Sequence, residues 1–170
     1  MHLVATPGVV VGVVPWLVTS WQVGSAPAYL LPLRVGGLVV TLVGTGVIVA
    51  EFLRFARAGG SPAPAVPTTQ LVVEGPYRHV RNPMYIAVVV GILGQALWFV
   101  SLELVVFAAV VAAGMAAFVR WYEEPALSGQ HGSSYDAYRA RVQAWIPRRR
   151  APDLTQPPAP DTGYRANDAR

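Results

Sequence analysis

The sequence predicts an all-α membrane protein with four transmembrane helices, a C-terminal amphipathic helix and a disordered tail. The chain of 170 residues is 54% hydrophobic and only 13% charged, with a mean hydropathy of +0.43, which is more apolar than an ordinary soluble domain. Residues 3–33, 82–102 and 104–119 carry no charged side chain. All the basic side chains other than histidine are arginines, and they stand beside these apolar runs, as expected for orientation in a membrane.

The composition also argues against several classes of function. The net charge of +4 is explained by membrane orientation, and no free basic helix with interleaved aromatic residues predicts binding of nucleic acid. The absence of cysteine excludes disulfides and thiolate sites. His2, His79 and His131 are scattered, so no metal site is expected. The glycine-rich nucleotide motifs and the serine-hydrolase motif are missing.

The first two predicted spans cover residues 3–23 and 33–55. Pro15 should kink the first span, which has neither the basic start nor the cleavage site of a signal peptide and is therefore expected to be retained. Glycines punctuate the second span and either allow close helix approach or are merely tolerated: Gly36, Gly37, Gly44 and Gly46. Glu51 and Arg54 near its end are interpreted as a solvated interfacial ion pair without a catalytic role.

A linker at residues 59–67 and an extended segment at 68–73 should lead into a turn at Gly75. The third span is then predicted at residues 83–99, with Asn82 as its cap and Pro83 in its first turn. Glu103 should lie in a turn before a fourth span at residues 104–121. One continuous helix over residues 83–122 is the alternative, but it would bury Glu103 at high cost, so a helical hairpin is favoured.

After the fourth span, a polar helix should start at Ser133 or Ser134. One apolar stripe is expected along it, formed by Tyr135, Tyr138, Val142 and Trp145. Residues 151–170 have nothing to bury and are predicted to be disordered. The chain thus divides into two N-terminal helices (1–58), a core (59–150) and a tail (151–170).

Arginine counting predicts the orientation of these spans. With the N-terminus inside, only one arginine near the membrane, Arg34, lies outside, in agreement with the positive-inside rule. We therefore expect a multi-pass integral membrane protein with its functional site facing the cytoplasm. The arginines on that side near the spans would be Arg54, Arg57, Arg78, Arg81 and Arg120.

Polar residues gather on this predicted cytoplasmic side, and they suit a charged, amphipathic small molecule. Carboxylates hold hydroxyl or ammonium groups, and tyrosine rings pack on a cation or an aromatic base. By spacing alone, the simpler alternative that these side chains only anchor helix ends at the interface is favoured. The set is Tyr77, Arg81, Asn82, Tyr85, Arg120, Glu123 and Glu124.

A family resemblance changes that balance. The run GPYRHVRNPMY at residues 75–85 resembles the G-x-Y-x-x-x-R-H-P-x-Y signature of the isoprenylcysteine carboxyl methyltransferase and phospholipid methyltransferase superfamily. EEPAL at 123–127 and GSSYDAY at 132–138 resemble the second half of its pattern, in the same order and at similar spacing. The resemblance covers residues 68–147 and implies methyl transfer from S-adenosyl-L-methionine to a lipophilic acceptor within a helical membrane bundle.

The resemblance also implies roles for individual residues. Glu123 takes the place of the family's cofactor-binding glutamate, and Arg120 is the nearest candidate to bind an acceptor carboxylate, about one residue out of register. Glu124 is the obvious base for an amine acceptor. The remaining implied cofactor-binding residues are Thr69, Gln70, Leu71, Val72, Tyr77, Arg81, Asn82, Pro83, Met84 and Tyr85.

One position departs from the family pattern. Asn82 stands where the family has histidine; it keeps hydrogen-bonding capacity but cannot titrate, and His79 would compensate only by an unusual backbone path. A lipid-like carboxylate is the acceptor we expect, with phospholipid or amine N-methylation as the alternative. A non-catalytic membrane binding or assembly protein is the third hypothesis, and Asn82 is the feature that favours it.

Overall fold

The computed structural model describes residues 8–24, 27–57 and 75–149, and every regular element within them is helical, which confirms the all-α class for that part. The predicted linker, the extended segment and the tail beyond residue 149 lie outside the described residues. The elements in order are η1 (Val9–Val13), α2 (Val14–Thr19), η2 (Ala28–Leu30), α3 (Leu31–Arg57), η3 (Gly75–Arg78), α4 (Pro83–Phe99), α5 (Leu102–Phe118), η4 (Val119–Glu123), α6 (Glu124–His131) and α7 (Ser133–Arg141).

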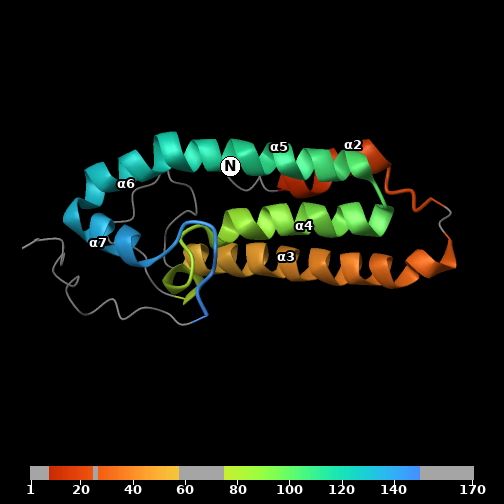
Figure 1. The fold of residues 1–170 in the computed structure, drawn as a ribbon, viewed down its shortest axis with the longest axis horizontal. Helices are drawn as coiled ribbons and strands as arrows, with labels where there is room; N and C mark the ends of the chain where they lie inside the picture. Colours follow the sequence, from red (N-terminus) through yellow and green to blue (C-terminus); the bar gives the residue numbers. More distant parts are fainter. Residues whose placement is uncertain (1–7, 25–26, 58–74, 150–170) are drawn as a thin grey trace, which may run out of the picture.

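The helices α3, α4 and α5 run along the long axis of the molecule, with α4 between the other two (Figure 1). The N-terminal helix, formed by η1 and α2, packs on α4 and α5. The elements η3, α6 and α7 gather at the end where α3 stops and α4 begins (Figure 1). The other end carries the turn between α4 and α5.

The N-terminal helix is shorter than expected. It covers only Val9–Thr19 of the predicted span, because Ser20 adopts a left-handed conformation with φ of 48° and ends it. Pro15 provides no N–H for the Val11 carbonyl four residues earlier, and the turn before it widens into the π-helix η1. The Gln95 side chain donates to that Val11 carbonyl at 2.8 Å, so α4 satisfies the acceptor that proline leaves open.

Two of the four glycines in α3 create a close contact with α4. A Cβ atom added at Gly37 would lie 2.6 Å from the Gly94 carbonyl oxygen, and one at Gly44 would lie 2.9 Å from the Ala87 carbonyl oxygen. Gly36 and Gly46 have open space around them. The close approach expected from the sequence therefore holds for Gly37 and Gly44, while the other two glycines are only tolerated.

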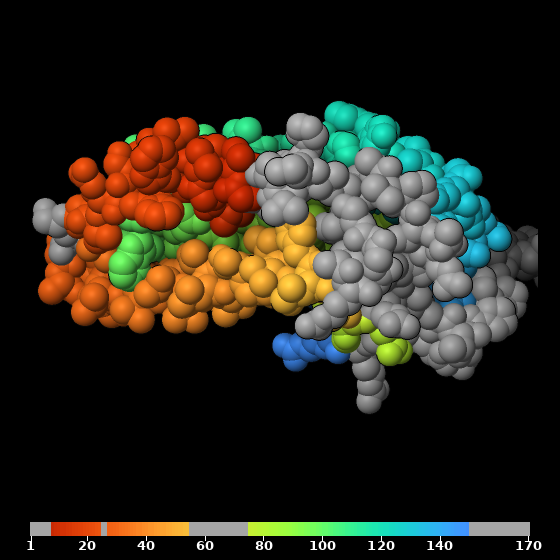
Figure 2. Space-filling model, turned by 180° about the vertical axis from the view of Figure 1, so that it is seen from behind, coloured from red at the N-terminus to blue at the C-terminus, as the bar shows by residue number. Residues whose placement is uncertain are grey.

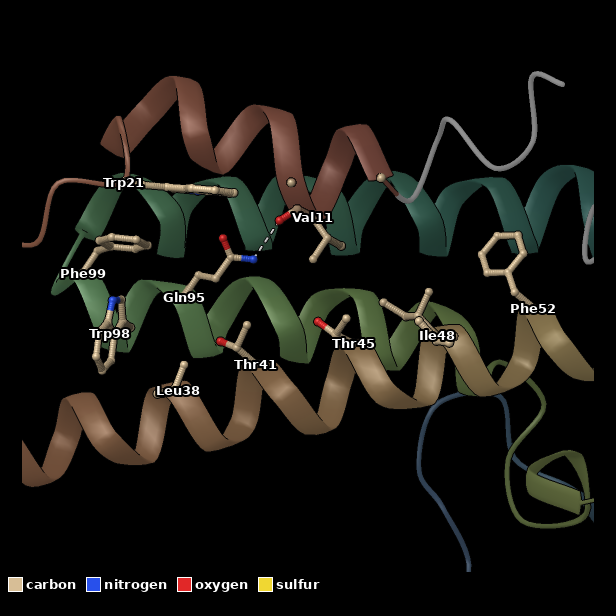
Figure 3. A pocket seen from close by; sticks show the side chains of 13 residues that line it. Val11, Trp21, Leu38, Thr41, Thr45, Ile48, Phe52, Gln95, Trp98 and Phe99 are labelled. Atoms are coloured by element: carbon tan, nitrogen blue, oxygen red, sulfur yellow. Dashed lines mark hydrogen bonds between the residues drawn. The ribbon is translucent and has the colours of Figure 1, made fainter.

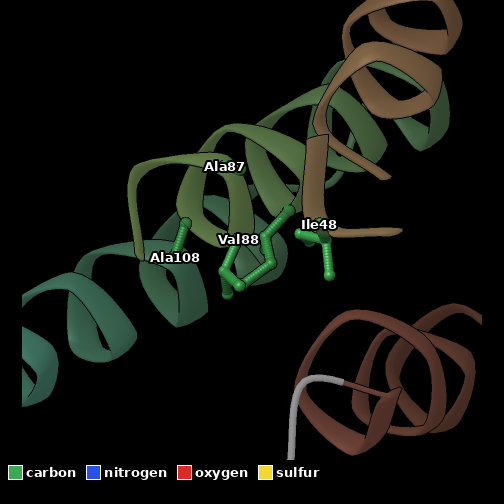
Figure 4. Packing of buried hydrophobic residues seen from close by; sticks show 5 residues of the cluster. Ile48, Ala87, Val88 and Ala108 are labelled. Carbon is green, nitrogen blue, oxygen red and sulfur yellow. The ribbon is translucent and has the colours of Figure 1, made fainter. Parts of the chain in front are cut away.

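The core is thin, and much of the apolar surface faces outward. Val88 of α4 packs between Ile48 of α3 and Ala108 of α5 (Figure 4). The outer faces of α3 and α5 expose large apolar side chains, such as Leu42 at 63% and Val110 at 64%. A helix that is apolar all round and not buried by protein requires an apolar solvent.

Within the described residues, two helices, rather than the four expected, are long and apolar enough to cross a membrane: Ala28–Arg54 and Leu102–His131. Two further apolar helices, Val9–Thr19 and Pro83–Phe99, fall below that length. α4 has the predicted bounds, with Pro83 at its start and Val100, with φ of 54°, just after its end, and its 17 residues are fewer than a full span requires. Long uncharged stretches predicted four spans because charge does not reveal where a helix starts or ends.

The connection between α4 and α5 is the helical hairpin that the sequence favoured. Ser101 is the N-cap of α5, and its hydroxyl accepts from the Leu104 N–H at 3.2 Å. Glu103 lies exposed in the first turn and accepts from the Ser101 hydroxyl at 2.7 Å. A negative charge at a helix N-terminus is favourable, so the turn stabilises Glu103 without burying it.

The helix that begins at Leu102 continues past the expected end near Trp121 to His131. It does so through η4, a π-helical turn immediately before Pro125. Proline removes one backbone donor and crowds the carbonyl four residues earlier, and a wider turn relieves both problems. The glutamate pair therefore lies inside a helix, at a point where side-chain directions change.

The predicted C-terminal helix is present but stops early. It begins at Ser133 as expected and ends at Arg141, because Val142 is already extended. Tyr135, Tyr138 and Val142 are buried together against Leu127. Trp145 was expected to continue this stripe but is 38% exposed, since the helical periodicity is lost before it.

Candidate functional site

The two polar runs meet at one end of the bundle. The Tyr85 hydroxyl, in the first turn of α4, donates to Glu123 Oε2 at 2.9 Å. Tyr85 and Glu123 are 38 positions apart, and the α4–α5 hairpin brings them together. The other Glu123 oxygen makes no hydrogen bond to a described residue, so this carboxylate keeps acceptor capacity.

The neighbouring carboxylate, Glu124, is held by two arginines. Arg81 Nη1 donates to Glu124 Oε1 at 2.8 Å, and Arg139 Nη2 lies 3.3 Å from Oε2. Arg81 also donates to the Tyr135 hydroxyl at 3.3 Å. The side chains of Arg81 and Glu124 are 12% and 7% exposed, so their charges are mostly shielded from water and depend on each other. This network joins the turn before α4 to α6 and α7.

Asn82 points away from the helix that it precedes. It occupies the expected N-cap position of α4, but its side chain makes no cap bond. Instead, its amide Nδ2 donates to the Ala144 carbonyl at 3.1 Å. The expectation that the Asn82 side chain caps α4 is therefore wrong, because the C-terminal segment offers its amide a buried carbonyl instead.

The segment after α7 lies along residues 79–82 through backbone hydrogen bonds. The Arg81 N–H donates to the Gln143 carbonyl at 2.9 Å, and the Arg148 N–H to the His79 carbonyl at 3.0 Å. His79 Nδ1 lies 2.8 Å from the Arg148 carbonyl. His79 is thus occupied with the C-terminal segment rather than standing in for the missing family histidine.

The tyrosines add a second link between α7 and the turn before α4. The Tyr138 hydroxyl donates to the Tyr77 carbonyl at 2.7 Å. Burial is the main cause that raises the pKa of the Tyr77 phenol, and the negative charges of Glu51 and Glu123 add to it. Burial likewise raises the pKa of Tyr135 and Tyr138. All three phenols therefore remain neutral hydrogen-bonding groups at physiological pH.

Glu51 belongs to this end of the molecule, which sequence reasoning missed. The residue is 1% exposed, and Arg54 Nε lies 3.7 Å from its Oε1. The interpretation as a solvated pair is therefore wrong for the carboxylate, although the Arg54 side chain is 47% exposed. The Arg54 guanidinium lies against Gly75, whose φ of 60° also favours glycine. The sequence signal that could have indicated this position is a single carboxylate, Glu51, shortly before the end of an apolar run.

The other expected site residues are distributed around this cluster. Pro83 is buried and Met84 half-buried in the first turn of α4, next to Tyr85. Arg120 is exposed on η4 and makes no hydrogen bond or ion pair to a described residue. Arg139 was not among the expected site residues, because an arginine on the polar face of a helix does not by itself indicate a site. The expected cofactor residues outside the described ranges are Thr69, Gln70, Leu71 and Val72.

An apolar groove runs along the bundle between the N-terminal helix, α3 and α4 (Figure 3). Its volume is about 620 Å³. Trp21, Trp98 and Phe99 surround one end, and Phe52 lies at the other (Figure 3). Thr41, Thr45 and Ile48 point into it from α3 (Figure 3). Figure 2 shows this face, with the N-terminal helix along one side, α3 along the other and α4 visible between them.

Within the described ranges, no group of three or more metal-ligating side chains comes together. The site therefore offers carboxylates, phenols and an arginine network at the end of an apolar bundle. Such a set suits a ligand that is polar or cationic at one end.

Comparison with known families matches residues 33–134, more than half of the chain, to the phospholipid methyltransferase family. The chain belongs to the phospholipid methyltransferase family. This family is part of the isoprenylcysteine carboxyl methyltransferase-like superfamily of membrane methyltransferases, so the resemblance stated from the two motifs is confirmed. No curated protein and no solved structure matches the chain.

Family membership has consequences for function. It indicates a membrane methyltransferase, a class for which S-adenosyl-L-methionine is the general methyl donor. The two apolar helices agree with membrane association. The matched region contains α3, α4, α5 and the Tyr85–Glu123 contact.

Proposed function

We propose that this protein transfers a methyl group from S-adenosyl-L-methionine to a lipophilic acceptor at a membrane surface. The observation that carries the proposal is the contact between Tyr85 and Glu123 at 2.9 Å. It joins the two motifs of a methyltransferase family at the end of an apolar bundle. A reaction between a polar nucleotide and a lipid needs a site at such a boundary.

The residues present fit the proposed cofactor. S-adenosyl-L-methionine supplies an electrophilic methyl group on a positively charged sulfur when bound. Glu123, one oxygen of which has no hydrogen bond to a described residue, and the phenols of Tyr77 and Tyr85 are groups that hold a cation or hydroxyls. Pro83 and Met84 provide apolar walls next to them. Thr69, Gln70, Leu71 and Val72 stay proposed contacts on the strength of the family pattern.

We assign positioning roles to Arg81, Asn82 and Glu124. Glu124 has both oxygens near arginines, so its carboxylate is already engaged by protein groups. Arg81 and Asn82 tie the start of α4 to α7 and to the segment beyond it. Their effect is to fix Glu123 and Tyr85 in place, which is most of what methyl transfer requires of a protein.

For the acceptor, the observed charges favour an amine. Glu51 and Glu123 both keep acceptor capacity, while Arg81 and Arg54 already face carboxylates. An amine must also lose a proton before its lone pair can attack, and a site rich in carboxylates accommodates both the ammonium and the proton. Phospholipid or amine N-methylation is therefore our first assignment.

A carboxylate acceptor is the second candidate, and one observation favours it. Arg120 is exposed on the π-helical turn beside Glu123 and makes no bond to a described residue. It is therefore available to orient an anionic acceptor. A carboxylate is already nucleophilic and would need no base.

We also propose a multi-pass arrangement with the site facing the cytoplasm. Helix α4 lies between α3 and α5 (Figure 1), so most of it is shielded from lipid by protein. At about 1.5 Å per residue its 17 residues are about 26 Å long, close to the ~30 Å hydrocarbon core. Arg34 lies at the opposite end of α3 from Arg54, in agreement with the positive-inside rule.

Two measurements test the proposal. Calorimetric titration of the folded, detergent-solubilised protein with S-adenosyl-L-methionine should show saturable binding, and radiolabelled methyl groups should enter membrane lipids. Base-stable label indicates an amine product, whereas base-labile label indicates an ester and the carboxylate acceptor. A folded protein that binds no S-adenosyl-L-methionine overturns the enzyme assignment and favours the non-catalytic alternative.

A further inference from the structure

The carboxylate of Glu51 has an unusual environment for a charged group in an apolar helix. Its side chain is 2% exposed. Oε2 is buried and has no hydrogen-bond partner, and among the described residues Oε1 has only Arg54 Nε, at 3.7 Å. Buried carboxylates are normally paired and hydrogen-bonded, because leaving one unsatisfied costs several kcal/mol.

A structural ion pair does not explain this arrangement. The distance of 3.7 Å is longer than a charge-assisted hydrogen bond. The Arg54 side chain is 47% exposed, so water screens its charge. The pair therefore leaves the buried half of Glu51 uncompensated.

Glu51 lies near two features, the methyltransferase site and the apolar groove. Arg54, which lies 3.7 Å from Glu51, contacts Gly75 of η3, and the charges of Glu51 and Glu123 both raise the pKa of Tyr77 in η3, so Glu51 lies close to the methyltransferase site. Along α3 it directly precedes Phe52 and follows Ile48 by one turn, and both of these line the apolar groove at its nearer end (Figure 3). A buried anion thus lies between the site and the groove.

The groove has suitable dimensions for a hydrocarbon chain. From Leu38 to Phe52, its wall on α3 is about 21 Å long at 1.5 Å per residue. That exceeds half of the ~30 Å hydrocarbon core of a bilayer. Its lining is almost entirely apolar, apart from Thr41, Thr45 and Gln95. Gln95 is bound to the Val11 carbonyl and Thr41 to the Gly37 carbonyl.

We propose that Glu51 binds the ammonium headgroup of the lipid acceptor, whose hydrocarbon chain lies in the groove between the N-terminal helix, α3 and α4. This inference rests on the proposed function and names the residues that select the acceptor. The ammonium group supplies the hydrogen bonds that Oε2 lacks. Glu51 acts in binding and positioning, and Glu123 remains assigned to the cofactor.

Lipid binding in the absence of cofactor tests the headgroup assignment. The probes are dioctanoyl phosphatidylethanolamine and dioctanoyl phosphatidylglycerol, titrated into wild type, Glu51→Gln and Glu103→Gln. We expect Glu51→Gln to weaken binding of the amine lipid by roughly ten- to a hundredfold, the usual loss for a charged hydrogen bond. Its affinity for S-adenosyl-L-methionine should not change. Glu103→Gln, at the other end of the bundle, should match wild type in both.

The possible results separate this proposal from the proposed function. If Glu51→Gln weakens binding of S-adenosyl-L-methionine instead, Glu51 belongs to the cofactor and the proposal is overturned. Equal loss for both lipids also overturns it, because the amine would then not be recognised. If wild type binds the amine lipid at Glu51 but no S-adenosyl-L-methionine, the methyltransferase assignment fails while this one stands.

Thermal unfolding distinguishes a ligand-binding carboxylate from a structural one. Without ligand, Glu51→Gln should unfold at the same temperature as wild type or higher, because it removes an uncompensated buried charge. A clearly lower unfolding temperature would show a structural ion pair and contradict the proposal. Addition of the amine lipid should raise the unfolding temperature of wild type more than that of Glu51→Gln.

A substitution in the groove tests the position of the chain. Thr45→Trp fills the groove from α3, where Thr45 points inward (Figure 3), and should weaken binding of both lipids at least about fivefold. Leu42→Trp is the matched control, because Leu42 is 63% exposed and does not line the groove. Equal affinities for the two variants would place the hydrocarbon chain elsewhere.

Discussion

At the scale of single residues, the three glutamates near the site differ by their partners. Glu124 is neutralised by Arg81 and Arg139. Glu123 accepts one phenol hydrogen bond from Tyr85. Glu51 is buried with one oxygen unsatisfied. These partners give each carboxylate a different role, although all three are chemically identical in the sequence.

The first residue-scale prediction concerns Glu123. Glu123→Gln removes the charge and keeps the shape, so the affinity for S-adenosyl-L-methionine should fall by roughly ten- to a hundredfold. Calorimetric titration measures the change. Glu103→Gln serves as the control, because Glu103 is exposed at the far end of the bundle. Equal affinities for both variants would show that the cofactor is not bound at Glu123.

A second residue-scale prediction concerns Asn82. Asn82→Ala removes the donor to the Ala144 carbonyl and should lower the free energy of unfolding by about 1–3 kcal/mol. Asn82→His retains a ring N–H donor and should lose less. Chemical denaturation in mild detergent gives the comparison. An alanine variant as stable as wild type would mean that this hydrogen bond does not hold the C-terminal segment.

At the scale of elements, packing depends on where the backbone is close enough to exclude a side chain. The backbones of α3 and α4 come close together at Gly37 and Gly44. This contact stabilises the N-terminal half of the bundle. The widened turn η4 allows one helix to continue past Pro125 and so presents Glu123 to Tyr85. Hydrogen bonds of the α7 tyrosines then hold the C-terminal segment near the start of α4.

Substitution of the α3 glycines should show that Gly44 lies in the contact with α4 and that Gly46 does not. Gly44→Leu forces a side chain against the Ala87 carbonyl and should destabilise the protein by at least about 1–3 kcal/mol. Gly46→Leu, two positions along the same helix, faces open space and should be nearly neutral. Unfolding temperatures in detergent compare them. Similar losses for both would contradict the observed helix contact.

The attachment of α7 provides a second prediction at this scale. Tyr138→Phe removes the hydrogen bond to the Tyr77 carbonyl and should lower the free energy of unfolding by about 0.5–1.5 kcal/mol. Tyr122→Phe is the control, since the Tyr122 hydroxyl makes no hydrogen bond to a described residue and the residue is 57% exposed. Limited proteolysis near α7 should increase only in Tyr138→Phe. No difference between the two would assign α7 docking to packing alone.

At the scale of the whole molecule, the apolar outer faces and the distribution of the arginines both agree with a bundle placed in a membrane. The outer faces of α3 and α5 require lipid, and the polar site lies at one end of the bundle. Under the proposed function, we therefore expect the lipid acceptor to reach the site from the side, through apolar surface, and the polar cofactor to reach it from water. This division follows from the axis of the bundle.

The predicted orientation is testable because the chain contains no cysteine. Gln130→Cys lies at the site end in α6, and Tyr29→Cys lies in η2 before α3, where Tyr29 is 78% exposed. In intact cells, a membrane-impermeant maleimide should label Tyr29→Cys and not Gln130→Cys. Inverted vesicles should reverse the result. Labelling of both from the same side would contradict the spanning arrangement.

The sequence by itself determined the features that depend on composition and local order. Apolar content predicted a membrane protein, and the two motifs predicted the family that was then confirmed. Local signals placed the starts of α4 and α7 at Pro83 and Ser133. The α4–α5 hairpin followed from the cost of burying Glu103. These features depend on neighbouring residues only.

Tertiary structure decided which side chains face each other. The sequence placed Glu51 in water, whereas packing at the end of α3 buries it beside the site. It also gave no indication that Arg81 and Glu124, both expected to contact ligands, pair with each other. The first span was overestimated because Ser20 ends the N-terminal helix through its backbone conformation, which the absence of charge does not indicate. Burial and pairing arise between residues distant in sequence, so no local pattern records them.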